Sequence, residues 1–210
     1  MLEALEPRLL LSADISYLDP ANSSDITVTD LTLKAEDLGG NLFLKLYQTS
    51  DLSNEVASVQ MDDAGDVDVN ISRAADADSY GDTISVDLST LSVLDSFVSA
   101  NGGSLNINFA GGNETPLIAD DHLVLQGNGG PNYALNINSS SDTTLDLSSV
   151  ASDLSVTVQA DGMLTVSDGV YSVTGISGVE NIIGGAGLNT VVFEDGAALA
   201  GRISGAGTTK

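Results

Sequence analysis

Residues 175–195 read GISGVENIIGGAGLNTVVFED and join a turn, a short apolar run, a glycine-rich corner and a second apolar run. Gly184, Gly185 and Gly187 form the corner, and the apolar residues 191–193 follow it. Because glycine has no Cβ penalty at φ > 0, such a cluster allows a tight backbone corner before a strand. The same unit of short strand and Gly/Asn/Asp turn recurs along most of the chain, and it predicts a stacked β structure.

From residue 81 onward, apolar and polar residues alternate in short segments separated by turns rich in Gly, Asn, Asp and Ser. This period of two predicts strands with one buried and one wet face. We expect a continuous aliphatic core that includes Leu105, Ile107, Leu145, Leu147, Val156, Val158, Val191 and Phe193. We expect the intervening polar residues to be exposed, among them Asn106, Asn108, Asp146 and Thr157. Residues 91–98 have helical spacing instead, which predicts one short helix.

Two all-β architectures fit short strands at this spacing: a sandwich and a solenoid. Aromatic residues make up only 4% of the chain and Trp is absent, so the core is aliphatic. Small aliphatic side chains, solvent-exposed outer faces and Asn/Gly corners favour the solenoid. We therefore predict an irregular parallel β-solenoid, similar to a β-helix, with a thin aliphatic core.

The composition excludes several classes of function. The chain has 210 residues, six Lys and Arg against 30 Asp and Glu, and a net charge of −24. This charge argues against nucleic acid as a partner, because phosphates require basic residues. No apolar run approaches the roughly 18 residues that a membrane-spanning helix needs, so we expect no membrane insertion.

Enzyme chemistry finds little support in the residue types. Cys is absent and His122 is the only His, which excludes zinc sites and thiol nucleophiles on count alone. Paired carboxylates leave a carbohydrate-active β-helix enzyme open as the alternative. Such a site on an anionic polysaccharide would use Lys or Arg, which are few and scattered here. We predict that the chain is not an enzyme.

Three segments of the chain differ in composition and in the pattern of apolar and polar residues. Residues 1–24 combine a short tag with a Pro-containing linker, and we expect them to pack loosely. Residues 25–78 contain two alternating runs around Gly39 and Gly40, which predict a β segment that is either a cap or the first layers. Residues 79–210 carry the repeated strands. The last residues stop where another strand is due, so we expect a segment that is truncated at its C-terminus and belongs to a longer, monomeric chain.

Four carboxylates lie within seven residues of one another: Asp62, Asp63, Asp66 and Asp68. Ca²⁺ takes several oxygen ligands, so this loop is a candidate calcium site. It lacks the order of an EF-hand loop. A solvated turn before the strand that begins at Val67 is the alternative.

The N-terminal residues carry a first resemblance. Leu5, Glu6, Pro7 and Arg8, followed by Leu10 and Leu11, resemble the LEPR-XLL motif, and residues 12–14 fit its usual continuation. That motif opens many very large, repetitive surface or secreted proteins of bacteria. The resemblance implies an extracellular or cell-surface location and a longer chain.

The C-terminal third carries a second resemblance. Residues 142–207 are similar to repeat tracts of giant bacterial surface proteins related to filamentous haemagglutinins and hemolysin-type calcium-binding proteins. Residues 184–192, GGAGLNTVV, resemble the calcium-binding nonapeptide of the latter. The resemblance implies that Gly184, Gly185 and Gly187 offer turn carbonyls to Ca²⁺. Asn189 stands where that family has an Asp ligand.

Together these resemblances imply a structural and adhesive role in a large repeat protein, with its surface or glycan ligand held by other modules. A calcium-responsive module is the second alternative.

Overall fold

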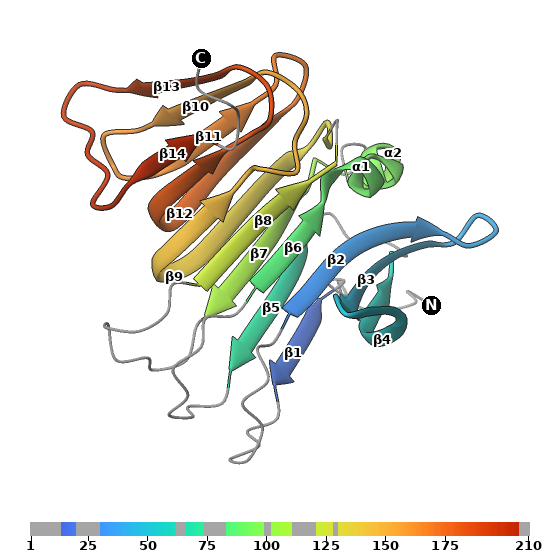
Figure 1. Ribbon diagram of the computed structural model, residues 1–210. Helices are drawn as coiled ribbons and strands as arrows, with labels where there is room; N and C mark the ends of the chain where they lie inside the picture. Colours follow the sequence, from blue (N-terminus) through green and yellow to red (C-terminus); the bar gives the residue numbers. More distant parts are fainter. Residues whose placement is uncertain are drawn as a thin grey trace, which may run out of the picture.

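The computed structural model describes residues 14–19, 30–61, 66–73, 83–98, 102–110, 121–127 and 130–205 (Figure 1). Across these residues, fourteen strands join one hydrogen-bonded mixed sheet in which most pairings are parallel. The prediction of an all-β protein is confirmed. The strands are β1 (Ile15–Asp19), β2 (Asp30–Asp37), β3 (Leu42–Gln48), β4 (Asp51–Gln60), β5 (Val67–Arg73), β6 (Thr83–Asp87), β7 (Ser104–Ala110), β8 (Asp121–Gln126), β9 (Ala134–Asp146), β10 (Leu154–Val158), β11 (Leu164–Ser167), β12 (Ser172–Gly184), β13 (Asn189–Phe193) and β14 (Ile203–Gly205).

Two columns of parallel strands organise the sheet. The first column consists of β1, β5, β7 and the first halves of β9 and β12. The second consists of β2, β6, β8, the second halves of β9 and β12, and β14. β9 and β12 are each 13 residues long, and each passes from the first column to the second. Figure 1 shows β5 and β7 running opposite to β6 and β8.

The parallel register places like residues in rows across the strands. One row of the first column ends in Ile137 and Ile176, and one row of the second column ends in Ile182 and Ile203. The first row contains Ile15, Val69, Ile107, Ile137 and Ile176. The second row contains Leu31, Ile84, Leu123, Leu145, Ile182 and Ile203. Because alternate side chains of a strand point to the same face, these rows face the core between the columns.

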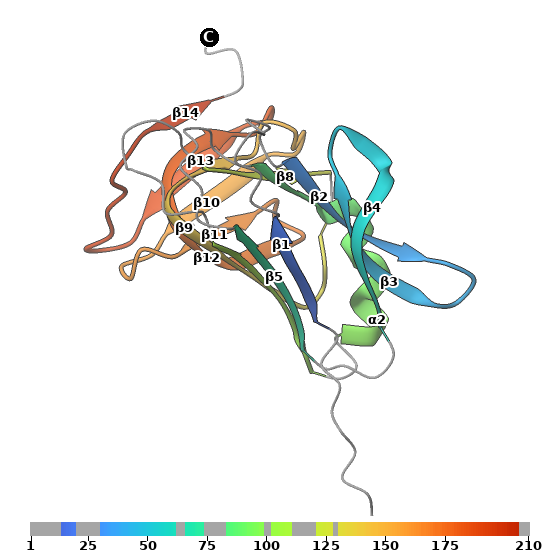
Figure 2. The same ribbon diagram turned by 90° about the horizontal axis from the view of Figure 1, so that it is seen from below.

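Additional strands extend the sheet at both ends. At the N-terminal end, β2, β3 and β4 form an antiparallel meander. At the C-terminal end, β12 pairs with β11 and β11 with β10, both antiparallel, and β10 pairs in parallel with β13. Figure 2 shows β3 and β4 at one end of the molecule and β13 and β14 at the other. The whole sheet wraps one core in a shape close to a barrel.

The aliphatic core is confirmed, except at its C-terminal end. Leu105, Ile107, Leu145, Leu147, Val156 and Val158 are all buried. Phe193 is 45% exposed, and Val191 is only half-buried. The prediction for Phe193 was wrong because β13 lies at the edge of the sheet, where no described strand packs over it. The four polar residues predicted to be exposed, Asn106, Asn108, Asp146 and Thr157, are half-buried, because aligned strands cover part of each.

The predicted helix is present and begins three residues earlier than expected. It is a succession of short helical turns: α1 (Leu88–Leu91), η1 (Ser92–Leu94) and α2 (Asp95–Val98). Leu88, Leu91, Leu94 and Val98 lie on one buried face, which is the face that the helical spacing indicates.

The N-terminal residues that the structure describes do not pack loosely. β1 is the first strand of the first column, and Ile15 is 2% exposed. This differs from the expected tag and linker, because a five-residue strand gains its stability from pairing with β5 rather than from its own apolar content. Residues 1–13 and 20–24 lie outside the described residues.

Candidate functional site

The glycine corner that resembles a calcium nonapeptide is held together by the side chain of Asn189. Its Oδ1 accepts a hydrogen bond from the Gly185 N–H at 2.8 Å. Its Nδ2 donates to the carbonyl oxygens of Gly185 at 2.7 Å and Gly187 at 3.0 Å. A Ca²⁺ ion at the usual ligand distance of about 2.3–2.6 Å from both carbonyls would contact that nitrogen. In this arrangement the amide group occupies the place of a cation.

The three glycines serve close packing rather than an unusual backbone angle. None of them has a positive φ, which corrects the expectation from the sequence. A Cβ on Gly185 would lie 2.9 Å from the Val150 carbonyl oxygen, and one on Gly187 would lie 2.6 Å from that of Ser152. The corner therefore lies directly against the preceding turn. The Ala186 N–H donates to the Val150 carbonyl at 2.9 Å and fixes this contact.

The acidic loop is only partly described. Asp62 and Asp63 lie outside the described residues. Asp66 Oδ1 accepts hydrogen bonds from the backbone N–H and the hydroxyl of Ser104, at 2.9 and 3.0 Å. Asp68 Oδ1 accepts from the Asn106 amide at 2.9 Å. Both carboxylates thus bind the neighbouring strand, and within the described segments no group of three or more His, Cys, Asp or Glu is placed to hold a metal.

Outward-facing amides of the first column form two ladders that the sequence reasoning missed. In one, Asn136 donates to Asn106, which donates to Asp68; in the other, Asn138 donates to Asn108, which donates to Asn70. All four hydrogen bonds measure 2.9 Å. The signal was present as the tetrapeptide LNIN, which occurs at residues 105–108 and again at 135–138. Stacked amides of this kind stabilise parallel strands in register.

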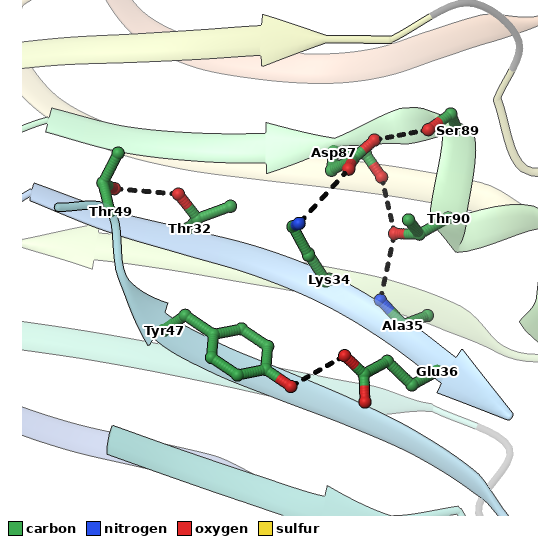
Figure 3. Close-up of polar contacts among 9 residues, drawn as sticks. All are labelled: Thr32, Lys34, Ala35, Glu36, Tyr47, Thr49, Asp87, Ser89 and Thr90. Atoms are coloured by element: carbon green, nitrogen blue, oxygen red, sulfur yellow. Dashed lines mark hydrogen bonds and ion pairs between the residues drawn. The ribbon is translucent and has the colours of Figure 1, made fainter. Parts of the chain in front are cut away.

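A cluster of charged side chains lies on β3 and its neighbouring strands. Lys45 Nζ lies 2.9 Å from Glu55 Oε2 and 3.3 Å from Glu36 Oε2. The Tyr47 hydroxyl donates to Glu36 Oε1 at 2.7 Å, and Figure 3 shows this bond together with the contact between Lys34 and Asp87 on the adjacent strands.

The electrostatics of this cluster are those of a stabilising network. The Tyr47 hydroxyl and then Lys45 lower the pKa of Glu36. The Ser58 hydroxyl and then Lys45 lower the pKa of Glu55. The hydrogen bond to Glu55 is the main reason that the pKa of Lys45 is raised. A general acid at neutral pH needs a raised carboxyl pKa, and both carboxyls here are shifted the other way.

The C-terminal end exposes apolar side chains on unpaired strand edges. Among the described strands, β13 pairs only with β10 and β14 pairs only with β12. Leu188 is 70% exposed, Val192 46% and Ile203 43%. Ile203 ends a row in which its neighbour Ile182 is 1% exposed. Apolar side chains that continue the core are therefore exposed to solvent at this end.

Comparisons with protein-family models, with curated proteins and with solved structures gave no match. In the described part of the chain, no helix has the length and apolar character needed to cross a membrane.

Proposed function

We propose that this chain is a structural, non-catalytic segment of a β-solenoid, and that it forms the N-terminal part of a large bacterial repeat protein at the cell surface or outside the cell. Further layers of the same design continue it at the C-terminal end and carry the molecule outward as a stalk with adhesive surfaces. The observation that carries the proposal is the uncovered end of the core at Ile203 and Phe193.

The chemistry of this end favours another β layer. In stacked β proteins each layer buries its apolar face only against its neighbours, so an uncovered layer is an incomplete one. β13 has the sequence NTVVF and β14 has ISG, and neither contains a charge or a proline that would prevent pairing.

The register supports a continuing stack as well. Ile203 lies opposite Ile182 and Gly205 lies opposite Gly184, which is 205 − 184 = 21 residues earlier. Gly205 therefore takes the same register position, on the adjacent strand, as Gly184, at which the glycine corner begins. A second copy of residues 185–205 placed directly after Gly205 would continue in the same register.

This lengthened chain tests the proposal. We expect the copy to pair with β13 and β14, to bury Phe193 and Ile203, and to raise the free energy of unfolding. Urea denaturation measures the stability, and binding of a dye specific for exposed apolar surface measures the burial. The matched control is a copy in which the residues equivalent to Val191 and Phe193 are Asn.

The expected result is a gain in stability and a loss of dye binding with the intact copy and neither with the control copy. Equal behaviour of the two lengthened chains would show that the end does not accept a layer of this design, and the proposal would be wrong.

A further inference from the structure

A groove of about 330 Å³ lies between the turn that follows β11 and the segment that leads into β9. Its volume is at the lower end of the range of about 300–1,000 Å³ that is usual for small-molecule sites. All of its lining residues are uncharged: Pro131, Asn132, Tyr133, Ala134, Val170, Tyr171, Ser172 and Thr174. In a chain with a net charge of −24, this neutral lining sets the groove apart.

The wall before β9 is held rigidly in place by the helical segment. Asp95 of α2 accepts hydrogen bonds from both the backbone N–H and the side-chain amide of Asn132, each at 2.7 Å. The hydroxyl of the buried Tyr133 donates to the Leu91 carbonyl at 3.2 Å. These bonds fix the wall before any ligand arrives.

The wall between β11 and β12 is a fixed turn. Asp168 Oδ1 accepts hydrogen bonds from the Val170 and Tyr171 N–H groups at 2.9 and 2.8 Å. The Ser167 hydroxyl donates to the Tyr171 carbonyl at 2.9 Å. This turn holds Val170 at 77% exposure, which costs free energy in water unless something covers the side chain. A groove with two prearranged walls loses little conformational entropy when a ligand binds.

Besides the bonded groups of Asn132 and Tyr133, three hydroxyls line the groove. The hydroxyls of Tyr171, Ser172 and Thr174 make no hydrogen bond to any of the residues that the structure describes. A hydroxyl both donates and accepts, and the hydroxyls of a sugar do the same. The ring of Tyr171 supplies an apolar surface beside them, as aromatic side chains do in many ligand sites.

We propose that this groove binds a unit of a neutral polysaccharide. Absence of Lys and Arg from the lining disfavours anionic sugars, and absence of Asp and Glu disfavours cationic ones. Ala134 and Asn136 are alternate residues of β9 and point to the same face. A polymer held in the groove therefore continues onto the amide ladder that contains Asn136 and Asn106. This inference rests on the proposed function, because it supplies the adhesive surface within this chain.

Affinity electrophoresis of the whole chain tests the binding, with dextran, glucomannan or xyloglucan in the gel as neutral polymers and alginate as the anionic one. The test variant is Tyr171→Phe combined with Thr174→Val, which removes two hydroxyls and keeps the shapes of the side chains. The control is Thr190→Val on β13, which removes an exposed hydroxyl away from the groove.

We expect at least one neutral polymer to retard the wild-type chain and the control, and the double variant to bind at least about tenfold more weakly, which corresponds to the loss of one or two good hydrogen bonds. Retardation by alginate alone, by no polymer, or equally for the double variant would overturn the inference. The stability of the lengthened chain tests the proposed function, and the gel tests the groove. Failure of one proposal is therefore distinguishable from failure of the other.

Discussion

The two ends of the sheet differ in how they cover the apolar core. At the N-terminal end, β3 and β4 extend the second column, and the buried side chains of Leu44 and Leu46 complete the core beneath them. We call these two strands the cap. At the C-terminal end, β13 and β14 expose Val192, Phe193 and Ile203. One end closes the core, and the other leaves it open.

Charge follows the same division. The cap carries Lys45 between Glu36 and Glu55, and its last strand begins with Asp51. Charges on an edge strand discourage pairing with another strand. β13 and β14 carry none, although 17% of the chain is charged. The two ends therefore differ in the charge of their edge strands: the described strands β13 and β14 lack the charges that discourage pairing at the cap.

Truncating one apolar side chain at each end should give the largest difference. Leu46 in the cap is fully buried, so Leu46→Ala should lower the free energy of unfolding by about 2–5 kcal/mol. Phe193 is 45% exposed, so Phe193→Ala should cost about 1 kcal/mol or less. Urea denaturation of the two variants at pH 7 measures both values.

The lengthened chain sharpens this comparison, because there Phe193 should be covered and its truncation should cost clearly more than in the original chain. Similar losses for both variants in the original chain would mean that the two ends do not differ in packing.

The contrast also shows how far the sequence could predict the fold. Alternation of apolar and polar residues predicted the strands and most of the core, because burial of one face depends only on a period of two. It predicted Phe193 as buried, because alternation says which face a residue takes and not whether a neighbour covers that face. The pairing of β1 with β5 depends on contacts across 54 residues (69 − 15 = 54), which no local pattern reveals.

For the candidate sites, the residue types in the sequence predicted less about possible ligands than the hydrogen bonds in the structure do. The corner that contains Gly185 and Asn189 was recognised, but its amide turned out to satisfy the carbonyls that a cation would need. The groove beside Tyr171 could not have been found from the sequence, because its two walls come from segments about 40 residues apart. The amide ladder was within reach through the repeated LNIN.

Glycines at the two ends should respond differently to substitution. Gly187 lies in the C-terminal corner, and Gly187→Ala would place a methyl group 2.6 Å from the Ser152 carbonyl oxygen, so we expect a loss of about 1–3 kcal/mol. Gly39 in the cap turn has a φ of +71° and open space around it. Asn tolerates that backbone conformation, so Gly39→Asn should change the stability by less than about 1 kcal/mol.

Denaturation of both variants checks this pair, with Leu188→Ala as the control in the same corner because that side chain is 70% exposed. We assign close packing as the constraint at Gly187 and the backbone angle as the constraint at Gly39. A large loss of stability in Gly39→Asn together with no loss in Gly187→Ala would contradict this assignment.

The charges of the cap should make a smaller, pH-dependent contribution. Lys45→Met keeps the apolar stem and removes the cation between Glu36 and Glu55, whose side chains are 34% and 38% exposed. Solvent screening limits the expected loss at pH 7 to about 0.5–1 kcal/mol. Because both carboxyls have a lowered pKa in the folded state, this stability is present above their ordinary value of 4.5 and is lost as the pH falls through the folded-state values.

Unfolding free energies of the wild type and Lys45→Met, measured from pH 7 downward, should therefore converge as the pH falls below 4.5 and through the lowered pKa values of Glu36 and Glu55. A constant difference across that range would mean that the contribution of Lys45 does not depend on the ionisation of Glu36 and Glu55.

The smallest effect concerns cations and the open end. With 30 acidic residues against six basic ones, self-repulsion destabilises the folded chain at low ionic strength, and added ions screen it. Mg²⁺ and Ca²⁺ screen alike at equal ionic strength, so only specific ligation separates them. Because Nδ2 of Asn189 lies against the carbonyls of Gly185 and Gly187, millimolar Ca²⁺ should raise the melting temperature no more than Mg²⁺ does.

Asn189→Asp replaces those amide donors with a carboxylate oxygen. We expect only a slight calcium-specific gain, because one carboxylate and two carbonyls fall short of the six to eight oxygens that Ca²⁺ takes. Thermal melts of both chains in the two salts measure the difference. A large calcium-specific gain in the wild type that disappears when Asp62, Asp63, Asp66 and Asp68 are all changed to Asn would place a calcium site in the acidic loop before β5.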